Sequence, residues 1–234
     1  MPTKGWAKIV SIYNTYRPTK FADVLGQASV AILRQQTEQQ VWHHSYLFYG
    51  ASGTGKTTTA RILAMAVNCD KLTSEPCGEC ESCQQIARGN HWDTIEIDGA
   101  NFRGIDDIQE LKRKAYLLPF GKRKVYIIDE AHMLTEPAFN AMLKLLEEPP
   151  PYLTIILCTT QKDKIPLTVL SRCQHFPFRT LEAGLIKTKL ARILEAEGKS
   201  LTDESIRHIL DFASGNMRSA ENALEQALVM TGAK

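Results

Sequence analysis

The sequence of 234 residues contains no run of about eighteen consecutive apolar residues, the length that a membrane-spanning helix requires. Its first ten residues include Lys4 and Lys8 but no apolar stretch of the kind found in a secretory signal. It also lacks internal repeats and low-complexity tracts. We therefore expect a compact cytoplasmic protein.

An excess of charge of either sign is also missing. The chain has 28 Lys and Arg residues against 26 Asp and Glu residues, which gives a formal net charge of +2. This balance excludes a protein that is held to nucleic acid by bulk electrostatics, although a local basic face is compatible with it. With 44% hydrophobic residues, the chain can bury a sizeable core. Partners must therefore be inferred from individual sites.

The pattern of apolar residues changes at about residue 180. Before it, short apolar strands alternate with helices of about 10–15 residues, which is typical of an α/β fold with a parallel sheet between two helical layers. After it, apolar residues recur every three to four positions, as in helices. The sequence predicts an α/β core over residues 1–179 and a small all-helical domain over residues 180–234. The expected strands cover residues 45–49, 94–97, 125–128, 154–158 and 175–178, and the expected helices cover residues 29–40, 56–67, 105–117, 136–146, 166–171, 182–198, 202–214 and 219–232.

A glycine-rich loop follows the first expected strand. Residues 50–57 match the pattern G-x-x-x-x-G-K-[S/T] between a buried strand and a helix. The glycines let backbone N–H groups surround phosphate oxygens, and the N-terminus of the next helix adds partial positive charge. We expect Lys56 to reach the β- and γ-phosphates of a nucleotide and Thr57 to bind Mg²⁺. The predicted binding residues are Gly50, Ser52, Gly53, Thr54, Gly55, Lys56, Thr57 and Thr58. The alternative is a turn that binds nothing.

Two adjacent acids end the apolar strand at residues 125–128. In a parallel sheet, Asp129 and Glu130 would lie beside the glycine-rich loop. We expect Asp129 to hold the Mg²⁺ shell and Glu130 to polarise the attacking water, because phosphoryl transfer depends on positioning and charge stabilisation. A base that activates water favours hydrolysis over phosphate transfer to a small molecule. Acids that are merely solvated at a strand end are the alternative.

Further motifs lie outside these two elements. Residues 16–18 read Tyr-Arg-Pro, residues 21–27 read Phe-Ala-Asp-Val-Leu-Gly-Gln, residues 145–150 read Leu-Leu-Glu-Glu-Pro-Pro and residues 171–173 read Ser-Arg-Cys. Together with the glycine-rich loop and the acid pair, they resemble the motifs of the AAA+ ATPases and, within them, of the bacterial clamp-loader ATPases. The resemblance covers nearly the whole chain. It implies a P-loop NTPase core with a helical lid and an active site completed by a neighbouring subunit.

The resemblance implies roles for single residues. Arg172 would be an arginine finger offered to the ATP of a neighbouring subunit, where it would stabilise charge on the γ-phosphate; a local salt bridge is the alternative. Thr160 is similar to the polar sensor 1 residue, with Thr159 as the competing assignment. Arg218 is similar to the sensor 2 arginine of the lid, which reaches the γ-phosphate. The residues implied to border the base and ribose are Arg17, Pro18, Val24 and Gly26.

Four of the six cysteines lie close together with the spacing C-x7-C-x2-C-x2-C. In a reducing compartment, such a cluster favours a metal or catalytic role over disulfides. The clamp-loader ATPases carry a zinc module at this place, and Zn²⁺ prefers four thiolates in a tetrahedron. We therefore expect a structural Zn²⁺ without a catalytic role, and free buried thiols are the alternative. The expected ligands are Cys69, Cys77, Cys80 and Cys83.

The partners implied by the resemblance are those of a replicative clamp loader: its delta and delta prime subunits, further copies of this chain, the sliding clamp and primed-template DNA, but no membrane. Arg103, at the start of an expected helix, is the expected contact to the DNA backbone. Two features depart from the family pattern. The residues after Arg218 differ from those usual in the family, and the family continues into a helical collar where this sequence ends at Lys234.

Other functions compete with this interpretation. Residues 129–132 spell Asp-Glu-Ala-His, the signature of a helicase class, but such helicases need a second ATPase-like domain that these 234 residues do not provide. An ATP-binding scaffold without turnover is a second alternative, against which Lys56, Thr57, Asp129 and Glu130 speak. A third is another DNA-dependent AAA+ motor, which would not be expected to carry both the cysteines and the Ser-Arg-Cys motif.

Overall fold

The computed structural model describes residues 11–101 and 105–230. These residues form two units, one of residues 18–179 and one that joins residues 11–17 to residues 180–230. Within these described ranges, no helix has both the length and the apolar character that crossing a membrane would take.

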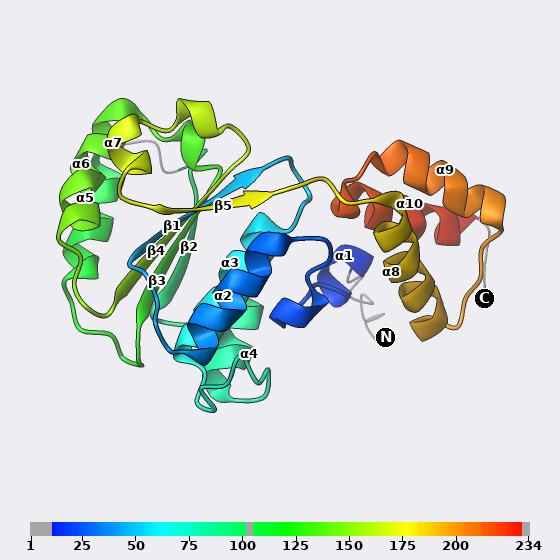
Figure 1. Ribbon diagram of the computed structural model, residues 1–234, viewed down its shortest axis with the longest axis horizontal. Helices are drawn as coiled ribbons and strands as arrows, with labels where there is room; N and C mark the ends of the chain where they lie inside the picture. The colour runs from blue at the N-terminus through cyan, green and yellow to red at the C-terminus, as the bar shows by residue number, and fades with distance from the viewer. Residues whose placement is uncertain (1–10, 102–104, 231–234) are drawn as a thin grey trace, which may run out of the picture. The chain divides into compact units, whose positions relative to one another are not determined.

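A parallel sheet forms the middle of the first unit (Figure 1). Its strand order is β2-β3-β4-β1-β5, so the strand that leads into the glycine-rich loop lies between two neighbours. Because all these strands run the same way, the loops at their carboxyl ends share one edge of the sheet. The strands are β1 (Ser45–Gly50), β2 (Thr94–Asp98), β3 (Lys124–Asp129), β4 (Leu153–Thr159) and β5 (Gln174–Phe178).

Helices cover both faces of this sheet, because successive residues of a strand point to opposite sides. In β3, Val125 and Ile127 belong to a core shared with α2, α3 and α4, whereas Tyr126 and Ile128 belong to a core shared with α5 and α6. Figure 1 shows these two groups of helices on opposite sides of the strands. The predicted α/β fold is confirmed. The helices and short 3-10 turns are η1 (Phe21–Asp23), α2 (Ala28–Glu38), α3 (Lys56–Asn68), α4 (Glu81–Arg88), α5 (Ile105–Ala115), η2 (Ala131–Met133), α6 (Glu136–Glu147), η3 (Lys162–Lys164) and α7 (Leu167–Leu170).

The helix α4 is not among those expected from the sequence. It begins directly after Cys80 and ends at Gly89, which has a φ of 74°. Only Cys83 and Ile86 on it are buried. Two apolar residues one turn apart are too short a pattern to distinguish a helix from a loop.

The second unit consists of helices. Within it, α8 (Ala183–Ala196), α9 (Asp203–Ala213) and α10 (Met217–Met230) bury one apolar stripe each and pack with the short α1 (Ile12–Thr15). From the sequence we placed α1 with the α/β core, whereas the backbone N–H of Ile12 donates to Glu225 Oε2 on α10 at 3.2 Å. The limits of the core and lid domains stay predictions.

Candidate nucleotide-binding site

The glycine-rich loop leaves β1 at Gly50 and enters α3 at Lys56. A Cβ atom at Gly50 would lie 2.0 Å from the carbonyl oxygen of Phe178 on β5, so no side chain fits there. Gly53 and Gly55 have φ values of 69° and 99°, in the left-handed region that favours glycine. The glycines predicted as binding residues are therefore required by the path of the backbone itself.

The ammonium group of Lys56 lies inside this loop. Its side chain is almost fully buried, and Nζ donates to the carbonyl oxygens of Gly50 at 2.9 Å and Ala51 at 2.8 Å. Thr54 Oγ1 also donates to the Ala51 carbonyl at 2.8 Å. The loop thus holds a positive charge at the N-terminus of a thirteen-residue helix, an arrangement suited to a phosphate group.

Thr57 and Asp129 meet at the edge of the sheet. Thr57 Oγ1 donates to Asp129 Oδ2 at 2.8 Å, and the Glu130 backbone N–H donates to Asp129 Oδ1 at 3.0 Å. Adjacent oxygens in the octahedral shell of Mg²⁺ are about 3 Å apart. A hydroxyl and a carboxylate oxygen at this separation fit two neighbouring positions of such a shell.

Burial raises the pKa of Asp129, and the hydrogen bonds from Thr57 and Glu130 offset only part of that effect. The folded chain therefore binds the carboxyl proton more tightly than the unfolded chain does. Its stability falls as the pH rises from the ordinary Asp pKa through the raised value, and the loss persists at neutral pH.

Asp129→Asn is accordingly expected to stabilise the metal-free chain at pH 7 while removing a Mg²⁺ ligand. We expect a higher melting temperature than that of the wild type, because the amide carries no charge to bury. Thermal unfolding in a chelating buffer measures it. Asp163→Asn, at an exposed carboxylate, is the matched control and is expected to change little. A lower melting temperature for Asp129→Asn would contradict a burial cost at this carboxylate.

Glu130 occupies a strained backbone position. Its φ is 47°, uncommon for a residue with a side chain. Thr160 Oγ1 donates to its Oε2 at 3.1 Å, and His132 Nδ1 lies 3.3 Å from the same oxygen. Thr159 instead contacts His132 Nδ1, at 3.0 Å. Of the two competing threonines, only Thr160 directs its hydroxyl to the acid.

The segment at residues 21–27 lies against the loop. A Cβ atom at Gly55 would lie 3.8 Å from Val24 Cγ1, so Val24 borders the loop, and its role toward the base and ribose stays a prediction. Gln27 Nε2 donates to the Thr54 carbonyl at 3.3 Å and to the Arg179 carbonyl at 2.8 Å. Gln27 thereby joins the loop to the end of β5.

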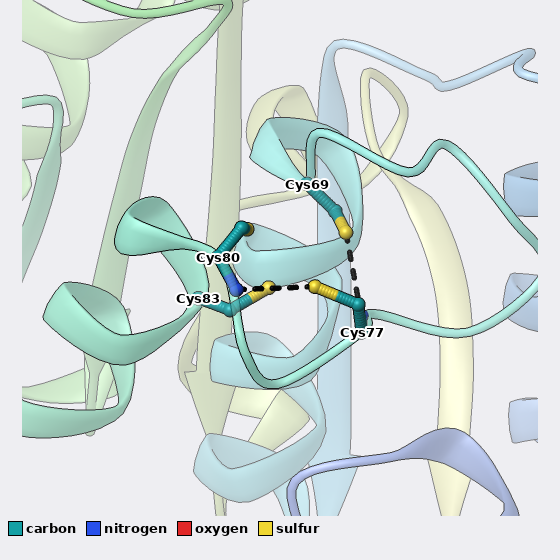
Figure 2. A group of neighbouring side chains, drawn as sticks. All are labelled: Cys69, Cys77, Cys80 and Cys83. Carbon is teal, nitrogen blue, oxygen red and sulfur yellow. Dashed lines mark hydrogen bonds between the residues drawn. The ribbon is translucent and has the colours of Figure 1, made fainter.

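The four predicted zinc ligands come together at the ends of α3 and α4 (Figure 2). Their Sγ atoms all lie within 4.8 Å of one another. Sulfur atoms in a tetrahedral Zn²⁺ site are about 3.8 Å apart, so shifts of less than about 1 Å would close the site. The cluster consists of Cys69, Cys77, Cys80 and Cys83.

Backbone N–H groups already point at these sulfur atoms. Those of Glu79 and Cys80 donate to Cys77 Sγ at 3.4 and 3.3 Å, and that of Cys77 donates to Cys69 Sγ at 3.3 Å. Burial by itself raises the pKa of Cys77, but these donors and the neighbouring thiols lower it to about 6. A thiolate is the form that binds metal, and Cys77 is predisposed to it, whereas burial raises the pKa of Cys83 well above its usual value. The fit to zinc therefore rests on four thiols gathered within the reach of one ion.

Comparisons with known proteins agree with this geometry. The family model described as DNA polymerase III, delta subunit, matches residues 26–182. The chain belongs to this family. It is 43% identical over 225 residues to DNA polymerase III subunit tau of Bacillus subtilis (strain 168), covering 95% of this chain and 40% of that protein. It is 44% identical over 218 residues to DNA polymerase III subunit gamma/tau of Mycoplasma pneumoniae, covering 92% of this chain and 32% of that protein.

The chain therefore corresponds to only part of each of these two relatives. The chain spans about a third to two fifths of the length of these two DNA polymerase III subunits. Among solved structures, the Thermotoga maritima RuvB Holliday junction branch migration motor is similar, with a TM-score of 0.69 and 18% sequence identity. The match covers 93% of this chain and 68% of that chain. A likeness at this identity shows that the two chains share a fold and nothing beyond that.

Arg172 lies away from the glycine-rich loop of its own chain. The register pairs Tyr46 with Gln174 and Gly50 with Phe178, so Arg172, which precedes β5, is at the amino end of these strands. That end is roughly 17 Å from the loop, since a strand rises about 3.3 Å per residue. Arg172 Nη2 donates to Glu147 Oε1 at 2.5 Å, in the Leu-Leu-Glu-Glu-Pro-Pro segment.

Two of the remaining predicted arginines, Arg17 and Arg218, belong to the second unit. In the second unit, Arg218 Nη2 donates to Tyr13 Oη at 2.8 Å, and the guanidinium groups of Arg17 and Arg218 lie 4.6 and 4.7 Å from the centre of the Tyr13 ring. Their roles toward a nucleotide stay predictions. Arg103 lies outside the residues that the structure describes.

Several neighbours of the site were missed by sequence reasoning. A Cβ at Gly99 would lie 2.7 Å from the Glu130 carbonyl oxygen, so this glycine makes room for the strained turn. His132 and Gln161 contact each other at 3.2 Å beside Glu130. Gly99 directly follows β2, one of the expected strands, and a glycine at such a place is a sequence signal for a close approach of another backbone segment. His132 and Gln161 had none, because their contacts join segments 29 residues apart.

Proposed function

We propose that the chain is the ATPase part of a bacterial clamp-loader subunit, which binds ATP to open a sliding clamp and place it on primed-template DNA, and hydrolyses ATP to release it. One observation carries this proposal: Thr57 and Asp129 meet at 2.8 Å beside the Lys56 loop, and the next residue, Glu130, is oriented by Thr160 at 3.1 Å. The kinship to DNA polymerase III gamma/tau subunits supplies the biological setting.

The chain's own groups would bind the triphosphate. The ammonium of Lys56 would exchange the carbonyls of Gly50 and Ala51 for phosphate oxygens, and the N-terminus of α3 would add its partial charge. Mg²⁺ held between Thr57 and Asp129 would neutralise phosphate charge. Val24 and Gln27, which contact the loop, would border the nucleotide together with Pro18 and Gly26.

Glu130 would act as the base that polarises the attacking water. His132 would support its position: with a proton on Nδ1 the imidazole would donate on that side, while Nε2 would accept from the Gln161 amide at 3.2 Å. Nδ1 lies 3.0 Å from Thr159 Oγ1 and 3.3 Å from Glu130 Oε2. The carboxylate would then have a hydroxyl donor from Thr160 and an imidazole donor from His132 on one side.

The site would be completed in trans. Arg172 is too far along the strands to reach the loop of its own chain, so we assign it as the finger for a neighbouring subunit: another copy of this chain, delta or delta prime. Arg218 would report on the γ-phosphate from the helical lid, and Arg103 would contact the DNA backbone. The four cysteines would hold a structural Zn²⁺ with no part in the chemistry.

Steady-state ATP hydrolysis tests the proposal, with the sliding clamp, the partner subunits and primed-template DNA added one at a time to the full-length chain. We expect turnover to rise only when clamp and DNA are both present. Stimulation by DNA alone would instead identify another DNA-dependent AAA+ motor. Binding of ATP without turnover under every combination would identify a scaffold.

A further inference from the structure

The loop that carries the cysteines also carries Glu75, whose carboxylate reaches the segment before α2. Phe21 N donates to Oε2 at 2.7 Å and Ala22 N donates to Oε1 at 3.2 Å. Arg34 Nε on α2 pairs with Oε1 at 3.1 Å. The Glu75 side chain is only 18% exposed, so these contacts are partly shielded from water.

The segment held by Glu75 is the one that borders the glycine-rich loop. Phe21 is 1% exposed and belongs to the same core as Cys69 and Cys83. Three residues further on, Val24 Cγ1 faces Gly55, and Gln27 donates to the Thr54 carbonyl. Contacts therefore run without a break from the cysteine loop, through residues 21–27, to the loop that would hold phosphate.

The loop that carries Glu75 has a cysteine of the cluster at each end. Residues 70–76 form neither helix nor strand and are closed by Cys69 on one side and Cys77 on the other. The ion pairs of Lys71 with Glu79 and of Lys122 with Asp70 are solvent-exposed, and such pairs contribute little. A metal that joins Cys69 to Cys77 would fix both ends of the loop.

We propose that Glu75 is a positioning residue of the nucleotide site, and that through it metal occupancy of the four cysteines sets the affinity for nucleotide. The inference rests on the nucleotide site proposed above. The zinc module would then have a role beyond folding, because it would hold residues 21–27 in place beside the glycine-rich loop. Linkage requires the effect to be reciprocal, so nucleotide must tighten Zn²⁺ binding by the same factor.

The test measures the dissociation constant of a fluorescent non-hydrolysable ATP analogue on the full chain, with and without Zn²⁺, alongside a colorimetric zinc assay. Glu75→Gln is expected to weaken binding about tenfold while one zinc per chain is retained. Asp70→Asn, on the same loop but paired only with exposed Lys122, is the matched control and should bind like the wild type. Removing zinc should weaken the wild type about tenfold and Glu75→Gln by less than about twofold.

Measuring the Zn²⁺ affinity with and without nucleotide distinguishes a positioning role of Glu75 from a general loss of structure. Saturating analogue should raise the Zn²⁺ affinity of the wild type about tenfold in competition with a chelator, and should leave that of Glu75→Gln nearly unchanged. If Glu75→Gln does not fold, Glu75→Asp keeps the charge, shortens the side chain by one methylene and should give the same loss of affinity.

Two results would overturn the inference while leaving the proposed function intact: equal nucleotide affinity of the wild type with and without zinc, or an equal effect of zinc removal on the wild type and on Glu75→Gln. A zinc-loaded wild type that binds no nucleotide would instead overturn the proposed function itself.

Discussion

Glu130→Gln is expected to lower the rate of ATP hydrolysis by about 10²–10⁴-fold while leaving nucleotide binding within about twofold of the wild type. The amide oxygen still accepts the hydrogen bond that Thr160 Oγ1 gives to the carboxylate at 3.1 Å, so the side chain keeps its place. It can no longer take a proton from water. Binding is measured with a fluorescent analogue and turnover by phosphate release in the assembled loader.

The control for this variant is Glu136→Gln, at an exposed carboxylate in the first turn of α6. It removes one negative charge six residues away and should leave turnover unchanged. A loss of less than about tenfold in Glu130→Gln would mean that another group activates the water. Loss of binding in Glu130→Gln would mean that the carboxylate supports the pocket instead of the chemistry.

Arg172→Ala is expected to reduce hydrolysis in the assembled complex by about 10³–10⁵-fold, the range for an arginine finger. Nucleotide affinity of the isolated chain should not change, because Arg172 lies at the amino end of the strands and the glycine-rich loop at the carboxyl end. The measurement is turnover in complexes that contain only variant copies of this chain, compared with wild-type complexes.

Glu147→Ala separates the finger from a local salt bridge. The two side chains are paired at 2.5 Å and are both substantially exposed, so the pair contributes at most about 1 kcal/mol to stability. If Arg172 served only that pair, both variants would have the same effect. A finger predicts normal turnover in Glu147→Ala, since the guanidinium stays available. Normal turnover in an Arg172→Ala complex would contradict the assignment.

The predictions for Glu130 and Arg172 rest on different kinds of sequence evidence. Glu130 was expected because the strand at residues 125–128 is continuously apolar and ends in two acids, a local pattern that needs no knowledge of the fold. Arg172 was expected only from the resemblance of residues 171–173 to a family motif. The structure adds that Arg172 lies far from the glycine-rich loop of its own chain. This follows from the register of β1 and β5.

Contacts between residues that are far apart along the chain could not be predicted from the sequence. Glu75 and Phe21 are 54 residues apart, and Gln27 and Arg179 are 152 apart. Each pair joins a side chain to a backbone group, and any Glu or Gln could make such a bond. No spacing or residue type in the chain distinguishes these side chains from their solvated equivalents, so only the folded arrangement identifies them.

The sequence by itself determined the α/β class, from the alternation of short strands and helices before about residue 180. It also located the glycine-rich loop, the acid pair and the four cysteines, because each of these motifs lies within about fifteen consecutive residues. The tertiary structure alone decided that Thr160 and not Thr159 faces Glu130, and that α1 packs with α10. It alone joined the cysteine loop to residues 21–27. The physical reason is that a hydrogen bond depends on where the backbone brings its partners, and that path is set by the whole core.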